Sequence, residues 1–204
     1  MAAYYWLKMQ RYTELRRLYG RYRAYSRSTG VNIWDAVILY ETIRRDKPRR
    51  ILEFGTGAST AYMALALRQN EMASVNEGGV IVSVESEAEF LDHQKEIFPE
   101  DLRRYVEFIY GPVKRKDYEG QTGFVYENVP HGCYDLIWVD GPALNQTIRF
   151  SGDVIDLIGS CSQRVRVLFD GRNETADTVI RLIGSGYVMK RYPHVHMSEI
   201  RAKG

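Results

Sequence analysis

Short apolar runs alternate with longer amphipathic segments over most of the chain. The runs have the length and composition of buried strands, at residues 51–54, 80–84, 105–110, 135–139 and 164–169. The segments between and after them favour helices, at residues 58–67, 86–98, 151–158 and 173–183. Strands that alternate with helices predict right-handed crossovers and a mostly parallel sheet with helices on both faces. The expected fold class is therefore α/β, with three layers.

The end of the chain departs from this alternation. Residues 187–192 and 195–201 have the pattern of two strands turned by Pro193-His194, which predicts an antiparallel C-terminal hairpin at one edge of the sheet. Residues 69–79 and 114–131 are polar, contain glycine and show no clear period. We expect the first to be a loop and the second to be a mobile loop or a small flap.

Residues 1–30 predict one amphipathic helix, an N-terminal extension to a single domain over residues 31–204. Apolar and tyrosine side chains recur at three- and four-residue steps and form one stripe, made of Tyr5, Met9, Tyr12, Leu15, Tyr19 and Tyr22. Seven basic residues accompany it, against Glu14 alone. We expect the stripe to pack on its own domain or on a second subunit, which would give a homo-oligomer. A membrane-surface or nucleic-acid patch is the less favoured alternative. A second helix should begin at Asn32, which resembles a capping box with Asp35.

Composition is that of an ordinary globular domain. The 204 residues are 45% apolar and 26% charged, with a net charge of +2. No apolar run approaches the roughly 20 residues that span a bilayer, and the N-terminus lacks the pattern of a secretory signal. We therefore expect a cytoplasmic protein without a transmembrane segment. Cys133 and Cys161 show no metal-ligand spacing, and in a cytosolic chain we expect free thiols.

The stretch 50–60, RILEFGTGAST, is the strongest candidate for a ligand site. It joins a buried strand that contains Glu53 to a turn with Gly55 and Gly57. Glycine allows a sharp turn and a close approach of a ligand to the main chain, as nucleotide-type cofactors require. Ser59 then stands where a helix should begin. The stretch therefore predicts a strand, a ligand-binding turn and a helix start.

Polar residues and glycines also end the later strands. In a parallel sheet, ligands bind outside the carboxyl ends of the strands, and there stand Glu85, Gly111, Asp140 and Asp170. A carboxylate after the second strand, here Glu85, is placed to accept hydrogen bonds from both ribose hydroxyls of a nucleoside ligand. The alternative is that Glu85 only interacts favourably with the dipole of the next helix.

These motifs, in this order, resemble the class I S-adenosylmethionine-dependent methyltransferases. They read EFGTGAST, VIVSVES, YDLIWVDGP and VLFDG, and the glycine turn is similar to the subgroup with G-x-G-x-S-T. The resemblance covers about residues 33–201. It implies a Rossmann-like sheet and S-adenosylmethionine as the cofactor.

The resemblance also implies roles for single residues. Glu53 would lie near the methionine amino group, and Glu85 would hold the ribose hydroxyls. Asp140 would lie close to the transferred methyl group and is the candidate catalytic residue. The other expected contributors to cofactor binding are Gly55, Gly57, Ser59 and Gly111. At Gly111-Pro112 the chain lacks the polar residue that members often carry for adenine, so adenine contacts must also come from elsewhere.

A metal is not expected. Metal-dependent O-methyltransferases of this fold carry an acid after the fourth strand and an acid pair, or an Asp-Asn pair, after the fifth. Asp140 and Asp170 match, but Gly171 stands at the third position, and Asn173 is the only nearby substitute. His131, in the polar insertion, could act as a base, although an exposed loop residue is the simpler interpretation.

The sequence thus predicts a methyltransferase that uses S-adenosylmethionine and acts on a small-molecule or glycan-type acceptor, through O-methylation. One alternative is a nicotinamide-dependent oxidoreductase, but Thr60 stands where the dinucleotide fingerprint needs glycine. The other is a cofactor-binding protein of the same fold without turnover.

Overall fold

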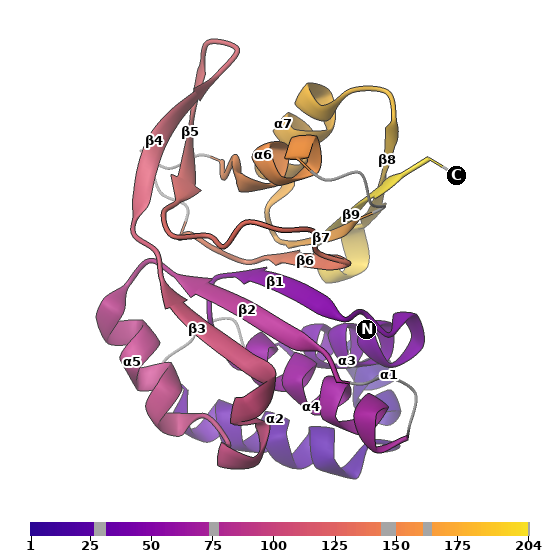
Figure 1. Ribbon diagram of the computed structural model, residues 1–204. Helices are drawn as coiled ribbons and strands as arrows, with labels where there is room; N and C mark the ends of the chain where they lie inside the picture. Colours follow the sequence, from indigo (N-terminus) through magenta and orange to yellow (C-terminus); the bar gives the residue numbers. More distant parts are fainter. Residues whose placement is uncertain (27–31, 74–77, 144–149, 161–164, 204) are drawn as a thin grey trace.

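The chain folds around a seven-stranded sheet (Figure 1). The computed structural model describes residues 1–26, 32–73, 78–143, 150–160 and 165–203. The strand order is β3-β2-β1-β6-β7-β9-β8, with β1 (Arg50–Phe54), β2 (Val80–Glu85), β3 (Val106–Tyr110), β6 (Leu136–Val139), β7 (Arg166–Asp170), β8 (Tyr187–Tyr192) and β9 (Met197–Ala202). The first five strands in this order, β3, β2, β1, β6 and β7, are parallel to one another. The last two, β9 and β8, are antiparallel and close the edge of the sheet. The predicted Rossmann-like sheet and its C-terminal hairpin are confirmed.

Helices cover both faces of the sheet, which gives three layers (Figure 1). One core joins one face to α1 (Ala2–Met9), α2 (Thr13–Tyr25), α3 (Ile33–Asp46) and α4 (Ala58–Met72). The opposite core includes α6 (Asp153–Ser160) and α7 (Asn173–Ile183). The alternation of side chains along β1 decides which core each residue joins: Ile51 lies in the first, Leu52 and Phe54 in the second. The helix α5 (Ala88–Ile97) and a short 3-10 helix, Glu100–Tyr105, connect β2 to β3.

The N-terminal segment forms two helices, so the prediction of one helix is wrong. The helix is interrupted between Met9 and Thr13, where Tyr12 has a non-helical backbone and its hydroxyl donates a 3.1 Å hydrogen bond to Glu41. This tertiary contact overrides the helical pattern. The stripe nevertheless packs on α3 and α4 of the same chain, because its buried members lie in their core: Met9, Leu15, Tyr19 and Tyr22.

The polar insertion 114–131 is largely a β-hairpin, which the sequence did not predict. It consists of β4 (Val113–Tyr118) and β5 (Gln121–Tyr126), which pair antiparallel and extend away from the main sheet (Figure 1). Glu119 and Gly120 both have positive φ, as two-residue hairpin turns require. The charged outer side chains of β4 hid the strand pattern. The expected loop at 69–79 is also partly helical, since α4 continues to Met72.

Two smaller findings bear on the expected location. Cys133 is disulfide-bonded, so the expectation of a free thiol is wrong for this residue, and Cys161 lies outside the described residues. Within the part of the chain that the structure describes, no helix combines the length and the apolarity needed to cross a membrane.

Candidate functional site

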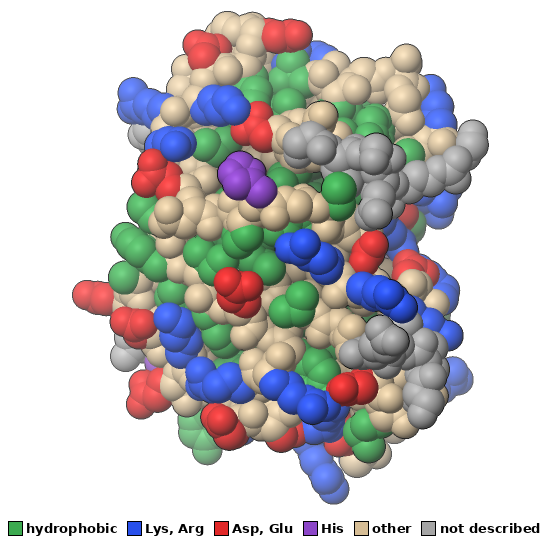
Figure 2. All heavy atoms as spheres, in the orientation of Figure 1, with side chains coloured by type: hydrophobic (Ala, Val, Ile, Leu, Met, Phe, Trp, Pro, Cys, Tyr) green, Lys and Arg blue, Asp and Glu red, His purple; other side chains and the backbone are tan. Residues whose placement is uncertain are grey.

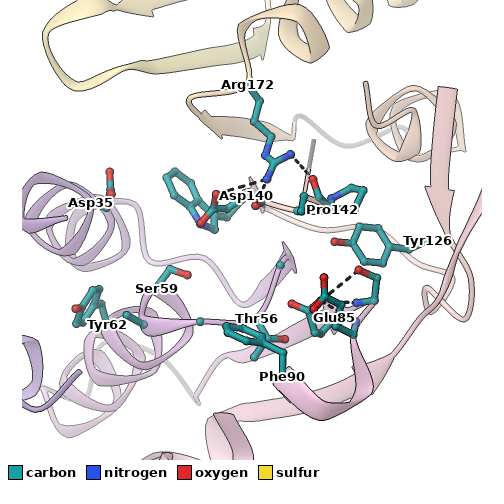
Figure 3. Close-up of a pocket in the computed structure, with 18 residues that line it drawn as sticks. Asp35, Thr56, Ser59, Tyr62, Glu85, Phe90, Tyr126, Asp140, Pro142 and Arg172 are labelled. Carbon is teal, nitrogen blue, oxygen red and sulfur yellow. Dashed lines mark hydrogen bonds and ion pairs between the residues drawn. The ribbon is translucent and has the colours of Figure 1, made fainter. Parts of the chain in front are cut away.

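A cavity of about 350 Å³ opens at the carboxyl ends of β1, β2 and β6 (Figure 3). Its lining comes from the β1–α4 turn and α4, from the end of β2 and the residues after it, from β6 and the turn after it, and from single side chains of α3, β5 and the residue before α7. Its size lies in the range of pockets that bind small molecules. Of the residues singled out in the sequence, Gly55, Gly57, Ser59, Glu85 and Asp140 all line it.

The β1–α4 turn brings main chain close to the cavity. Gly55 has φ +93°, and a Cβ there would lie 2.8 Å from the Gly141 nitrogen and 2.9 Å from the Asp140 carbonyl carbon. The turns after β1 and β6 are therefore in direct contact, and because of this contact only glycine fits at position 55. Gly57 precedes α4, whose first residues Ala58 and Ser59 also line the cavity. The partial positive charge of this helix start therefore faces the cavity.

Glu53 lies beneath the turn and does not line the cavity. Its fully buried carboxylate accepts hydrogen bonds from Ser59 Oγ at 2.5 Å, from Ser83 Oγ at 2.6 Å, and from Thr60 Oγ1. Burial raises the pKa of Glu53 to about 7, although these hydroxyls partly offset the effect. The geometry gives Glu53 a role in tying β1, β2 and α4 together. A contact with a methionine amino group stays a prediction.

Glu85 ends β2 at the opposite side of the cavity from α3 (Figure 3). Its Oε1 accepts hydrogen bonds from the main-chain nitrogens of Ser86 at 2.6 Å and Glu87 at 3.0 Å. Among the described residues no hydrogen bond reaches Oε2. Burial raises the pKa of Glu85, although its backbone donors partly offset this. A fixed carboxylate with one open oxygen can accept hydrogen bonds from a ligand's hydroxyls.

Asp140 follows β6 and is held by Arg172, which the sequence did not single out. Arg172 donates hydrogen bonds to the main-chain oxygens of Asp140 and Pro142, and its Nη2 lies 3.8 Å from Asp140 Oδ1 (Figure 3). Burial and, to a lesser degree, the charge of Asp170 raise the pKa of Asp140 to about 8, although the charge of Arg172 opposes this rise. Asp140 is therefore a carboxylate that can bind and release a proton near neutral pH.

Buried polar groups without partners mark the end of the cavity near α3. No hydrogen bond within the described residues reaches either carboxylate oxygen of Asp35, the Tyr62 hydroxyl or the Trp138 Nε1. The sequence assigned Asp35 only to a capping box, but α3 has no side-chain cap bond, and Asp35 lines the cavity. Burial, with smaller contributions from the charges of Asp170 and Asp140, raises the pKa of Asp35 to about 9, although the Asn32 side chain opposes this rise.

Other candidates lie outside the lining. A Cβ at Gly111 would lie 2.4 Å from the Glu127 carbonyl oxygen, so this glycine serves close packing, and adenine contact there stays a prediction. His131 is exposed and does not line the cavity. Asn173 accepts a 3.4 Å hydrogen bond from Ser198. Among the described residues, no group of three or more His, Cys, Asp or Glu side chains is placed to hold a metal ion.

Solved structures share the fold. A methyltransferase from Geobacter sulfurreducens is 12% identical, with a TM-score of 0.55 over 82% of this chain and 78% of that one. An O-methyltransferase from Bacillus cereus in complex with SAH is 14% identical, with a TM-score of 0.53 over 94% and 90%. The precorrin-6y C5,15-methyltransferase from Geobacter metallireducens is 10% identical, with a TM-score of 0.50 over 88% and 92%. At these identities the likeness shows the fold alone. No curated protein matches the sequence significantly.

The sequence also matches a family model directly. The model describes a methyltransferase domain and matches residues 52–170, more than half of the chain. This span runs from β1 to the end of β7 and includes the turn at Gly55, the carboxylate of Glu85 and the turn at Asp140. The chain therefore belongs to this methyltransferase-domain family, within the class I S-adenosylmethionine-dependent methyltransferases, and has their Rossmann-like fold.

Proposed function

We propose that the protein transfers a methyl group from S-adenosylmethionine to a hydroxyl group of a small-molecule or glycan-type acceptor. One observation carries the proposal: a single cavity is bordered by the fixed carboxylate of Glu85, the glycine turn at Gly55 and the proton-binding side chain of Asp140. The family match supports methyl transfer, and the similar Bacillus cereus structure is an O-methyltransferase in complex with SAH.

The cavity fits the chemistry of such a donor. The open oxygen of Glu85 can accept hydrogen bonds from ribose hydroxyls. Gly55 and Gly57 leave the main chain accessible, and the start of α4 at Ser59 can receive a carboxylate, because helix N-termini bind anions. When bound, the donor supplies a methyl group whose bond to the sulfonium sulfur breaks toward sulfur. The protein's main tasks are therefore alignment and proton removal.

Asp140 is the proposed base. Its carboxylate accepts the proton that the acceptor hydroxyl loses, and a pKa of about 8 suits a base that works near neutral pH. Arg172 positions it by binding the main chain of the same turn. Glu53 supports the site indirectly, because its carboxylate accepts hydrogen bonds from hydroxyl groups of β2 and α4. We do not assign His131 a role.

Two alternatives differ in their cofactor or their chemistry. A nicotinamide-dependent oxidoreductase is less well supported, because the family match is to methyltransferases and Thr60 replaces the third glycine of the dinucleotide turn. A cofactor-binding protein without turnover would show donor binding without methyl transfer. An assay that follows S-adenosylhomocysteine formation with a panel of hydroxyl acceptors separates these cases. We expect product with the native chain and strongly reduced product with Asp140→Asn. NADH oxidation without product would contradict the proposal.

We also propose that a second copy of the chain covers the exposed apolar side chains of α1, namely Tyr4, Trp6 and Leu7. Nucleic acid is not the favoured partner. Basic and acidic side chains are interspersed over the face that Figure 2 shows, so its coloured residues form no continuous basic surface there. The cytoplasmic location stays a prediction, and the disulfide of Cys133 is an observation against it.

A further inference from the structure

We propose that the end of the cavity formed by Asp35, Tyr62 and Trp138 binds an ammonium group of the methyl acceptor. The acceptor class would then be a small hydroxyl compound that carries a protonated amine, such as an amino alcohol or an amino sugar. This inference rests on the proposed function, because it takes the methyl donor to occupy the Glu85 end.

Asp35 carries the inference because it is a buried acid without a partner. Its side chain lines the cavity, yet the residue is only 4% exposed, and no hydrogen bond of ordinary geometry reaches either carboxylate oxygen within the described part of the chain. The side chain of Asn32 lowers the pKa of Asp35, but among the described residues no cationic side chain opposes the effect of burial on it. Burying such a group without a partner is unfavourable. Folded proteins keep groups of this kind mainly where they serve a function. A ligand that donates hydrogen bonds or carries positive charge would satisfy Asp35.

The neighbours of Asp35 suit an ammonium group. Tyr62 and Trp138 line the same cavity, and each is 1% exposed with its polar atom unpartnered among the described residues. Aromatic side chains attract ammonium groups, and a desolvated site strengthens the attraction. A carboxylate beside a tyrosine and a tryptophan therefore favours a cationic nitrogen over a neutral hydroxyl.

The charge balance at this end also favours a cation. The acids that act on Asp35 are Asp170 and Asp140, and the basic groups opposing these acids are Arg172 and His196. Arg172 already donates hydrogen bonds to main-chain oxygens. Of the four acids that line the cavity within the described residues, Asp35 and Asp140 lie away from the Glu85 end (Figure 3). Arg172 is the one basic residue of that described lining. An added positive charge would stabilise the ionised forms of Asp35 and Asp140.

The position of Asp35 points to the acceptor and not to the donor. In Figure 3 Asp35 and Tyr62 lie across the cavity from Glu85, the residue proposed to hold the donor's ribose. The acids that act on Asp35 stand at the ends of β6 and β7, whereas Glu85 ends β2. Between them lies β1 with its glycine turn. A donor that extends from Glu85 along this turn leaves the Asp35 end for the acceptor.

The test uses matched probes that differ in one group. Tyramine and tyrosol differ by an ammonium in place of a hydroxyl, and so do glucosamine and glucose. Binding of each probe to the protein saturated with S-adenosylhomocysteine is measured by calorimetry at about pH 6.5, where both amines are mostly protonated. The proteins are the native chain, Asp35→Asn, Tyr62→Phe, and Asp92→Asn as a control for charge, since Asp92 is exposed on α5.

We expect at least one ammonium probe to bind the native chain at least about tenfold more tightly than its neutral partner. Asp35→Asn should abolish this preference, Tyr62→Phe should weaken it, and Asp92→Asn should leave it unchanged. Binding to Asp35 should also release protons, so the heat should differ between phosphate and MOPS buffers, neither of which contains a primary amine. In Asp35→Asn the affinity for S-adenosylhomocysteine should stay that of the native chain.

Several results would overturn the inference. Equal or absent binding of both members of every pair would exclude an ammonium subsite. A loss of S-adenosylhomocysteine affinity in Asp35→Asn would assign Asp35 to the donor's own amino group. Failure of the proposed function looks different: the native chain would not bind S-adenosylhomocysteine at all. In that case the probes are measured on the ligand-free protein. An ammonium preference that depends on Asp35 would then support the ammonium site but overturn its assignment to a methyl acceptor.

Discussion

Arg172 binds the main chain of Asp140 and at the same time lies beside its carboxylate. Its Nη2 donates a hydrogen bond to the main-chain oxygen of Asp140 and lies 3.8 Å from Oδ1. Its Nη1 donates to the Pro142 oxygen. One side chain from the start of α7 therefore fixes the turn after β6 and opposes the rise in the pKa of Asp140 that burial and Asp170 cause.

Replacing Arg172 should move this pKa upward. In Arg172→Met the favourable charge is lost, so the Asp140 carboxyl should bind its proton at higher pH than in the native chain. Arg172→Lys keeps the charge but not both hydrogen bonds, and it should give a smaller shift. NMR titration of carboxyl carbons in protein labelled at aspartate measures this directly. Arg191→Met is the control, because Arg191 is an exposed residue that pairs with Asp177. A lower pKa in Arg172→Met would contradict the proposed geometry.

Gly55→Ala should destabilise the fold strongly. Alanine would need to adopt φ +93° and place its Cβ within 2.9 Å of the main chain of residues 140 and 141. We expect a loss of about 2–4 kcal/mol in the free energy of unfolding. Gly20→Ala is the matched control, since Gly20 lies inside α2 and a Cβ added there would meet nothing within 4 Å. It should gain about 0.5–1 kcal/mol. If urea unfolding gave the same change in the free energy of unfolding for Gly55→Ala and Gly20→Ala, the turns after β1 and β6 would not be in contact.

The fold could be predicted because its signals are local. Each parallel strand is a short, mostly apolar run that ends at or just before a glycine or an acid, and α7 was predicted with the bounds it has, Asn173–Ile183. The turn at Gly55 was likewise readable, since a sharp turn next to a ligand needs glycine. The hairpin of β4 and β5 was missed because β4 carries a run of charged residues and the hairpin lies outside the main sheet.

The site was only half predictable, for a related reason. Residues at strand ends are placed by the sheet, so Glu85 and Asp140 could be found from their position alone. Asp35 reaches the same cavity from α3, and Arg172 reaches it from the residue before α7, so both depend on packing between distant segments. No pattern in the sequence records that approach. Glu53 shows the reverse: its position suggested ligand contact, but local hydroxyls occupy its carboxylate.

The stability of the ligand-free protein should fall as the pH rises from about 5 to about 8. The folded pKa is about 9 for Asp35 and about 7 for Glu53, both above the usual 3.8 and 4.5. Between the usual and the raised values the folded chain binds more protons than the unfolded chain, so deprotonation favours unfolding. Asp46, whose pKa is lowered, acts only below this window.

Urea midpoints at both ends of this window test the sign. Asp35→Asn removes one of the raised carboxyls, so its midpoint should depend less steeply on pH than that of the native chain. It should also be the more stable protein at the higher pH. A native midpoint that rises with pH would contradict the account of these buried acids.

The exposed face of α1 should mediate self-association. Trp6 is 48% exposed and Leu7 is 69% exposed, while Met9 on the same helix is buried. Light scattering should find a dimer of the native chain, and Trp6→Glu should be a monomer. Val188→Glu, at a 37% exposed position on β8, is the control and should stay dimeric. A native chain that is monomeric at every concentration would exclude this contact.

Calorimetry with S-adenosylhomocysteine tests the central claim most directly. The native chain should bind it at one site, and Glu85→Ala should weaken binding by about tenfold or more, because the ribose hydroxyls lose their acceptor. Glu89→Ala is the control and should bind like the native chain, because Glu89 is an exposed acid on α5 that does not line the cavity. No binding to the native chain at millimolar ligand, or unchanged affinity in Glu85→Ala, would contradict the account.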